Sequence, residues 1–321
     1  MALIFLVVEK LDDLPMITVE KTESGMVITA GRSMSRSARI WYVIRSVVNH
    51  FAELWGYREL IWNLVVRDLK LRYRNSVLGV LWSLINPLLM MLVFTLVFTV
   101  MTPYSDVKSF PVFVLLALLP WNFFSSSVIG SIQSIVGNAS LVNKVYFPRE
   151  VLPISVVLAN LVNFLIALIV LFALIAAFRI PVTGWVILLP VVIVVQVFFT
   201  IGFCLVMATA NVFYRDTQVI MEVIMLAWFF MTPIFYSVAI LPDSYEIEAL
   251  GLSFDVSRWM RILNPMASII ANYRTVLYGS GSGGAAPEPY FFIRTLLTAL
   301  AFLVIGSLIF FRFSRRFGEE V

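Results

Sequence analysis

The chain has little of what soluble catalytic sites are built from. Among its 321 residues there is one cysteine, Cys204, and one histidine, His50. A single cysteine excludes an internal disulfide, and metal sites usually need several Cys or His ligands. The sequence also lacks a glycine-rich phosphate loop followed by Lys-Ser/Thr. We therefore expect no catalytic centre, metal or cofactor in this chain, and no ATP-hydrolysing site of its own.

Charge is scarce as well. Charged residues make up 13% of the chain and hydrophobic residues 61%, and the mean hydropathy is +0.95. A soluble domain carries about 25% charged residues. The composition therefore predicts an all-α integral membrane protein. Residues 1–54 are more polar, and we expect a cytosolic N-terminal arm there, with short strands in MITVE and GMVITA.

The rest of the chain is organised by long apolar runs. A membrane span needs about 20 apolar residues. Six stretches meet this requirement, at about 77–101, 110–136, 151–178, 185–210, 218–237 and 291–312. With six spans both termini share a side, and 17 of the 23 Lys and Arg residues lie on it. Cytoplasmic loops carry an excess of Lys and Arg, so we expect a multi-pass plasma (inner) membrane protein with cytosolic termini.

An amphipathic stretch at 58–74 precedes the first span. As a helix it has a narrow polar stripe that includes Arg67, while Asp68 and Arg72 fall inside the apolar arc and are predicted to pair. Two interpretations stay open: a helix in the lipid headgroups, or one packed against protein on more than one side. The connecting string KLRYRNS contains no Gly or Pro, so we expect the helix to be joined rigidly to the first span.

The string GNASLVNKVYFPREVLPIS at 137–155 lies between the second and third spans. It gathers aromatic and charged residues on one predicted cytosolic turn. An ordinary interfacial loop would account for them, with a tyrosine anchor and a basic side chain. The same cluster also suits docking to a partner protein.

Aromatic residues gather toward the outer end of the fifth span and also occur in the first. Residues seven apart on one helix share a face, so Trp228 is expected beside Phe235 and Phe229 beside Tyr236. Such rings can stack on sugars, or they can form an interfacial aromatic belt. The candidates for a substrate path are Trp82, Phe94, Phe98, Trp228, Phe229, Phe230, Phe235 and Tyr236. Glu222 in the same span is expected to reach the interface or pair with Arg215, rather than to act on the path.

Five strings in order resemble one family of transporters. They are RDLKLRYRNSVLGVLWSLINPL, LVNKVYFPREVLP, NVFYRDTQVI, WFFMTPIFYS and LNPMASIIANYRTVLYG. Together they resemble the permease subunits of type-2 ABC exporters of O-antigen, teichoic acid and capsular polysaccharides. The resemblance covers roughly residues 55–316, the expected transmembrane domain, and leaves 317–321 as a cytosolic tail.

The resemblance implies a homodimer with two copies of a separate P-loop ATPase that binds ATP and Mg, and a channel for a lipid-linked polysaccharide. The stretch with Arg67, Asp68 and Arg72 resembles a cytosolic gate helix. The segment 263–278 resembles an external, half-buried helical gate. The turn resembles the coupling helix that contacts the ATPase, through Leu141, Lys144, Tyr146, Phe147, Pro148, Arg149 and Glu150.

Three other functions compete with this one. A type-2 ABC permease for a drug or lipid would share the architecture, although the polysaccharide-type strings argue against it. A lipid-linked sugar transferase would need acids or bases converging near a membrane face, and only Glu222 lies inside a span. A secondary transporter would need ionisable residues at mid-membrane, and the predicted spans lack them.

Overall fold

The computed structural model describes residues 17–22, 25–30, 53–74, 79–97, 109–181, 184–236, 245–247, 252–254, 256–278 and 288–320. Its chain divides into two units, residues 1–50 and 51–321. In the first unit, β1 (Ile17–Thr22) and β2 (Gly25–Ala30) form an antiparallel hairpin with Ile17 opposite Ala30. The expectation of short strands in this arm is confirmed.

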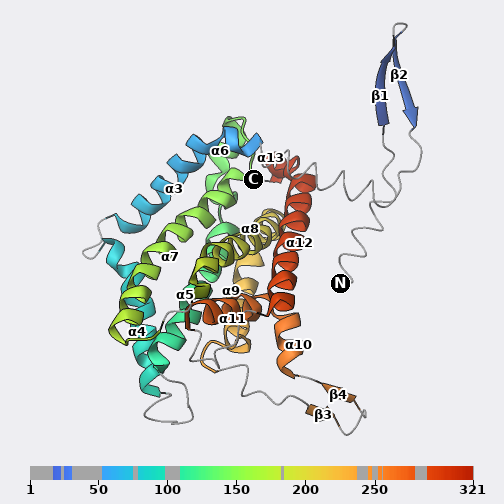
Figure 1. Cartoon of the computed structure of the whole chain (residues 1–321). Coiled ribbons are helices and arrows are strands. Elements are labelled where there is room, and N and C mark those ends of the chain that lie inside the picture. The colour runs from blue at the N-terminus through green and yellow to red at the C-terminus, as the bar shows by residue number, and fades with distance from the viewer. Residues whose placement is uncertain are drawn as a thin grey trace. The chain divides into compact units, whose positions relative to one another are not determined.

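In its described residues, the second unit is helical apart from one small hairpin (Figure 1). Its α-helices are α3 (Arg58–Tyr73), α4 (Trp82–Leu96), α5 (Phe110–Ile132), α6 (Ala139–Lys144), α7 (Val151–Ala177), α8 (Leu189–Phe213), α9 (Thr217–Met231), α10 (Val256–Leu263), α11 (Pro265–Tyr278), α12 (Pro289–Ser314) and α13 (Phe317–Glu320). Short 3-10 helices are η1 (Gly79–Leu81), η3 (Val136–Asn138) and η4 (Gly184–Leu188), and the hairpin is β3 (Tyr245–Ile247) with β4 (Leu252–Phe254).

Among the described residues, four helical segments are long and apolar enough to cross a membrane: Phe110–Ile132, Val151–Ala177, Gly184–Phe213 and Pro289–Ser314. Two shorter apolar helices, Leu84–Leu96 and Thr217–Met231, overlap the other two predicted spans. The prediction of a helical membrane protein is confirmed in this coarse form.

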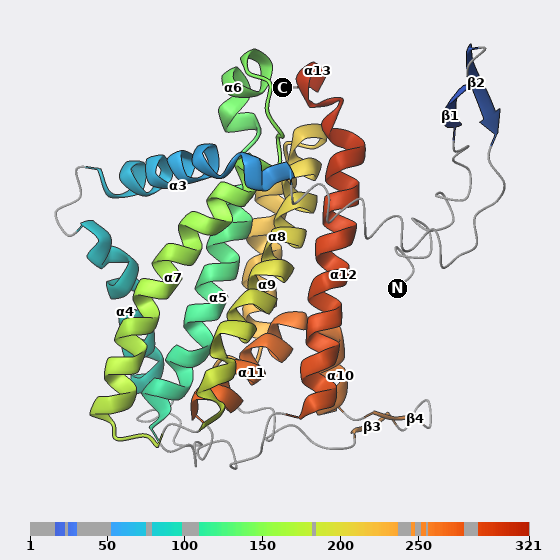
Figure 2. The ribbon, with the colours of Figure 1, turned by 45° about the horizontal axis from the view of Figure 1, so that its top comes forward.

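Helix α5 lies at the centre of the helical unit. Figure 2 shows α5, α7, α8, α9 and α12 running side by side, with α3, α6 and α13 at one end and α10 and α11 toward the other. Every residue from Val112 to Trp121 is buried. Since α5 contacts α4, α7, α8, α9 and α11, it positions the other helices.

Helix α3 is not continuous with the first predicted span, so the expectation of a rigid joint is wrong. Helix α3 ends at Tyr73, and Arg74 has an extended backbone with φ −63° and ψ 131°. The next described element is η1, where Gly79 has φ +51°. Glycine adopts this left-handed backbone without steric cost, and α3 crosses the direction of α4 (Figure 2).

The tightest helix contact joins α8 to α12. A Cβ added to Gly306 would overlap the backbone carbonyl of Gly202, and one added to Gly202 would overlap the backbone at Phe302. Small residues let membrane helices approach this closely. The contact holds α12 against the core.

We expect Gly306→Ala to destabilise the protein by about 1–3 kcal/mol, the usual cost of overpacking. Thermal unfolding of the purified protein in detergent measures the effect. The matched control is Gly137→Ala, because a Cβ at Gly137 meets nothing within 4 Å. Equal unfolding temperatures for the two variants would contradict the close contact.

Candidate functional site

Helix α3 is connected by its side chains to two other elements. Arg67 pairs with its neighbour Asp68 at 2.9 Å and donates through Nη1 to Asn138 Oδ1 at 3.0 Å. Arg72 Nη1 donates to Asn160 Oδ1 at 2.7 Å, on α7. The predicted Asp68–Arg72 pair is therefore wrong. The Asp68 carboxylate pairs with Arg67, and the Arg72 guanidinium hydrogen-bonds to the Asn160 side chain of α7.

Within the chain, α3 packs on one side. Leu64 and Val65 are buried, and α7 is its main helical neighbour. Trp62 is 61% exposed and Leu71 is 59% exposed. This arrangement agrees with an amphipathic helix at a membrane surface, and it leaves an exposed apolar face on α3.

The turn between α6 and α7 separates into an exposed tip and a buried base. Helix α6 ends at Lys144, and Val145 is extended. Tyr146 is 99% exposed, and Lys144 is exposed beside it. Asn143 and Val145 are also exposed at this tip, although they were not among the residues predicted to contact a partner.

The base of this turn is tied to the helix bundle. Arg149 Nη1 donates to the backbone carbonyl of Ser314 in α12, and Glu150 is only 5% exposed. Leu141, Phe147 and Pro148 are half-buried. Of the residues predicted to contact a partner, Lys144 and Tyr146 are therefore exposed, while Arg149 joins the turn to α12 and Glu150 is buried.

The predicted aromatic path is largely part of the core. Phe229 and Phe235 are buried, with ring centroids 5.4 Å apart. The ring of Phe94 is tilted against that of Phe235, with centroids 4.0 Å apart. Trp228 is half-buried, and its indole Nε1 donates to Asn264 Oδ1 at 2.9 Å. These contacts favour a structural role for the four rings.

The remaining path candidates differ in exposure. Phe230 is 62% exposed and Trp82 is 51% exposed, whereas Tyr236 is half-buried. Phe98 lies outside the described residues. The prediction that these residues, seven apart, share one helix face is wrong, because α9 ends at Met231 and Thr232 is extended. The chain then turns at Pro233, so that Phe235 and Tyr236 are not on the helix that carries Trp228.

Arg274 of α11 closes this turn. Its guanidinium donates to the carbonyls of Pro233 at 2.7 Å and Ile234 at 2.6 Å, and lies 3.6 Å from the centre of the Phe113 ring. Helix α11, predicted to be half-buried, is mostly buried. A buried cation needs such partners, so Arg274 fixes α11 to the end of α9.

A polar group interrupts the exposed apolar face of α9. Gln218 Nε2 donates to Glu222 Oε1 at 3.1 Å, and Gln133 at the end of α5 hydrogen-bonds to Gln218. Glu222 is exposed, and its described partner is Gln218 rather than the predicted Arg215.

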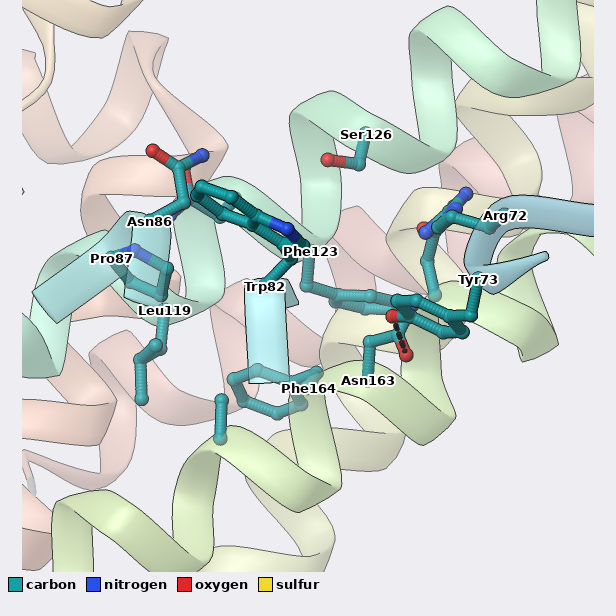
Figure 3. Close-up of a pocket in the computed structure, with 13 residues that line it drawn as sticks. Arg72, Tyr73, Trp82, Asn86, Pro87, Leu119, Phe123, Ser126, Asn163 and Phe164 are labelled. Carbon is teal, nitrogen blue, oxygen red and sulfur yellow. Dashed lines mark hydrogen bonds between the residues drawn. The ribbon is translucent and has the colours of Figure 1, made fainter. Parts of the chain in front are cut away.

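A cavity of about 330 Å³ lies between α3, α4, α5 and α7 (Figure 3). It is lined by Arg72, Tyr73, Trp82, Asn86, Pro87, Leu119, Asn122, Phe123, Ser126, Asn160, Asn163, Phe164 and Ala167. Figure 3 shows Asn86 at one end and Arg72 with Tyr73 at the other. The volume is at the small end of the range for small-molecule sites.

Comparison with known proteins identifies the family. Residues 59–278 match the ABC-2 type transporter family, and the chain belongs to this family. It is 41% identical over 226 residues to the O-antigen export system permease protein RfbA of Myxococcus xanthus, covering 70% of this chain and 83% of that protein. It is 31% identical over 264 residues to an O-antigen export system permease protein RfbA of Klebsiella pneumoniae, covering 81% and 94%. The family resemblance predicted from the sequence is confirmed, and the chain is a transport subunit rather than an enzyme.

We expect Arg274→Met to destabilise the protein more than any exposed arginine substitution. It leaves two buried carbonyls without these donors, at a cost of about 1–3 kcal/mol each. The unfolding temperature in detergent measures the loss, with Arg315→Met at an exposed position as the control. A similar unfolding temperature for both variants would show that Arg274 does not fix the turn.

Proposed function

We propose that this chain is the membrane-spanning subunit of an ATP-driven exporter of a lipid-linked cell-surface polysaccharide. The observation that carries the proposal is its likeness to O-antigen export permeases over 70% to 81% of its length. The drug or lipid alternative lacks any comparable support among these relatives.

The proposed topology has six spans, with α4 and α9 as the first and fifth. Helices α3, α6 and α13 then lie on the cytosolic side of the inner membrane, with both termini. Lys70, Arg74, Lys144, Arg312 and Arg316 lie in or next to the elements at this end, and an excess of basic residues marks cytoplasmic loops. Helices α10 and α11 form the external gate in this topology.

The exposed tip at Lys144 and Tyr146 is the proposed contact for the ATPase. A fully exposed tyrosine on a short turn is the kind of residue that becomes a binding anchor. We propose that two copies of a P-loop ATPase dock there, and that ATP and Mg bind to those subunits.

The proposed path lies between two copies of this chain, along α9. Most of its outward residues are apolar, including Val219, Val223 and Leu226. Glu222 lies among them, and a carboxylate facing hydrocarbon is costly. A water-filled passage between two subunits would hydrate Glu222, Gln218 and Gln133, so these residues support a homodimer with its channel on this face.

Movement of the docked turn reaches the membrane helices through side-chain contacts in this scheme. Arg149 connects the turn to Ser314 of α12. Arg67 connects α3 to Asn138 just before α6, and Tyr73 OH donates to Asn163 Oδ1 of α7 at 2.8 Å. In this scheme these contacts, and not a rigid joint between α3 and α4, transmit movement from the turn to the membrane helices.

We expect Tyr146→Ala to weaken ATPase binding at least tenfold, about 1.4 kcal/mol, because an exposed anchor is lost without disturbing the fold. Co-purification of the ATPase and glycan export by cells measure the effect. The control is Tyr290→Ala, which removes another exposed tyrosine. Tyr290 lies in the first turn of α12, outside the turn between α6 and α7. Unchanged ATPase binding by Tyr146→Ala would remove the turn as the docking site.

The Arg67–Asn138 contact is tested by a double-mutant cycle. Arg67→Met and Asn138→Ala should each lower export per ATP hydrolysed by a similar factor, because both remove the same hydrogen bond. The double variant should lose little more. Fully additive losses would show that the two residues act separately.

A further inference from the structure

The cavity between α3, α4, α5 and α7 has an unusual lining for a membrane helix bundle. Four asparagine side chains, from Asn86, Asn122, Asn160 and Asn163, come from three helices. Polar side chains facing lipid are unfavourable and are normally turned toward protein or water. The lining therefore suits a polar occupant.

Some polar side chains of this lining hydrogen-bond within the protein, and others do not. Arg72 and Tyr73 hydrogen-bond to Asn160 and Asn163, and Asn160 Nδ2 donates to Val156 O at 3.1 Å. Within the described part of the chain, the side chains of Asn86, Asn122 and Ser126 have no hydrogen-bond partner. They are available to a ligand.

The chemistry of the lining favours a sugar over a phosphate. A carboxamide both donates and accepts hydrogen bonds, which matches the hydroxyl groups of a sugar ring. Phosphate recognition relies on cationic groups, whereas the described lining offers one cation, Arg72, whose Nη1 already donates to Asn160. None of the described lining residues carries a carboxylate, so they present no negative charge to a neutral polar ligand.

Aromatic side chains in the lining also suit a sugar. Trp82 and Phe123 line the same cavity, and Trp82 is half exposed, so its ring is open to contact. An aromatic face packs against the C–H face of a sugar while polar groups bind its hydroxyls. Figure 3 shows Trp82 and Phe123 in the part of the cavity between Asn86 and Tyr73.

We propose that this cavity binds a sugar ring of the exported glycan, within one subunit and apart from the path along α9. The inference rests on the proposed function, because the glycan is the ligand that such an exporter would present. Asn122 of α5 and Asn86 of α4 bind the hydroxyl groups, and Trp82 packs against the ring. Arg72 and Tyr73 hold Asn160 and Asn163 in position and connect the site to α3.

Photo-crosslinking tests the site directly. The permease is expressed with its ATPase in cells that make the glycan, with p-benzoylphenylalanine placed at Ser126 or, as a control, at Ser125. Ser125 is the next residue of α5 and does not line the cavity. We expect glycan attached to the permease after illumination at Ser126, and far less at Ser125. Crosslinks to phospholipid alone, or equal glycan labelling at both positions, would overturn the proposal.

A second variant separates this site from the exporter function. Asn122→Leu removes a free carboxamide without breaking a hydrogen bond within the protein. We expect about tenfold less glycan crosslinking at Ser126 and reduced export, since losing a hydrogen bond of about 1.4 kcal/mol is a factor of ten. Full export and crosslinking by Asn122→Leu would reject the cavity as a sugar site while leaving the exporter intact. Absence of glycan export by the unmodified complex would instead reject the proposed function.

Discussion

The constraint on which this structure depends is that buried backbone groups in an apolar interior must find hydrogen-bond partners. Side chains from other segments supply partners for some of these groups. Asn211 Nδ2 donates to the carbonyl of Ile132, at the end of α5. Gln196 Nε2 donates to the carbonyl of Pro120 inside α5, and Arg274 does the same for the turn after α9. Each donor joins two segments distant in the sequence, so satisfying the backbone also fixes how the helices pack.

This constraint explains how α9 can be short and largely uncovered. Arg274 from α11 closes its end, and Asn264 Nδ2 donates to Thr232 Oγ1 at 3.0 Å. Both partners lie on the inner side of α9, so its opposite side stays exposed. That side carries Glu222 among apolar residues, which distinguishes it from an ordinary lipid-facing surface. The buried turn and the exposed polar group thus belong to one arrangement, in which the core holds one side of α9 and leaves the other side exposed.

Much of the helical architecture was predictable from the sequence, because apolar runs report directly on membrane insertion. Side-chain partners were not. Asp68 and Arg72 satisfied the four-residue rule, yet Arg72 binds Asn160, 88 residues away. Local spacing cannot reveal such a competitor. The cavity was missed for the same reason, since Asn86, Asn122 and Asn163 look unrelated until three helices bring them together. Trp228 was expected beside Phe235, but α9 ends at Met231, and Phe229 contacts Phe235 instead.

Two positions on α3 show how one helix can connect the proposed ATPase contact to the proposed sugar site. Its middle, at Arg67, contacts the segment before α6, whose far end carries the exposed Tyr146. Its last turn, at Arg72 and Tyr73, holds two asparagines of the cavity. Closely packed interiors transmit displacement rather than absorb it, and α3 lies on α7 through buried Leu64 and Val65. A shift of the turn would therefore move α3 along α7 and alter the cavity directly, with no need for a rigid connection into α4. The extended backbone at Arg74 ends α3 before α4 begins, so the two helices do not form one rigid rod.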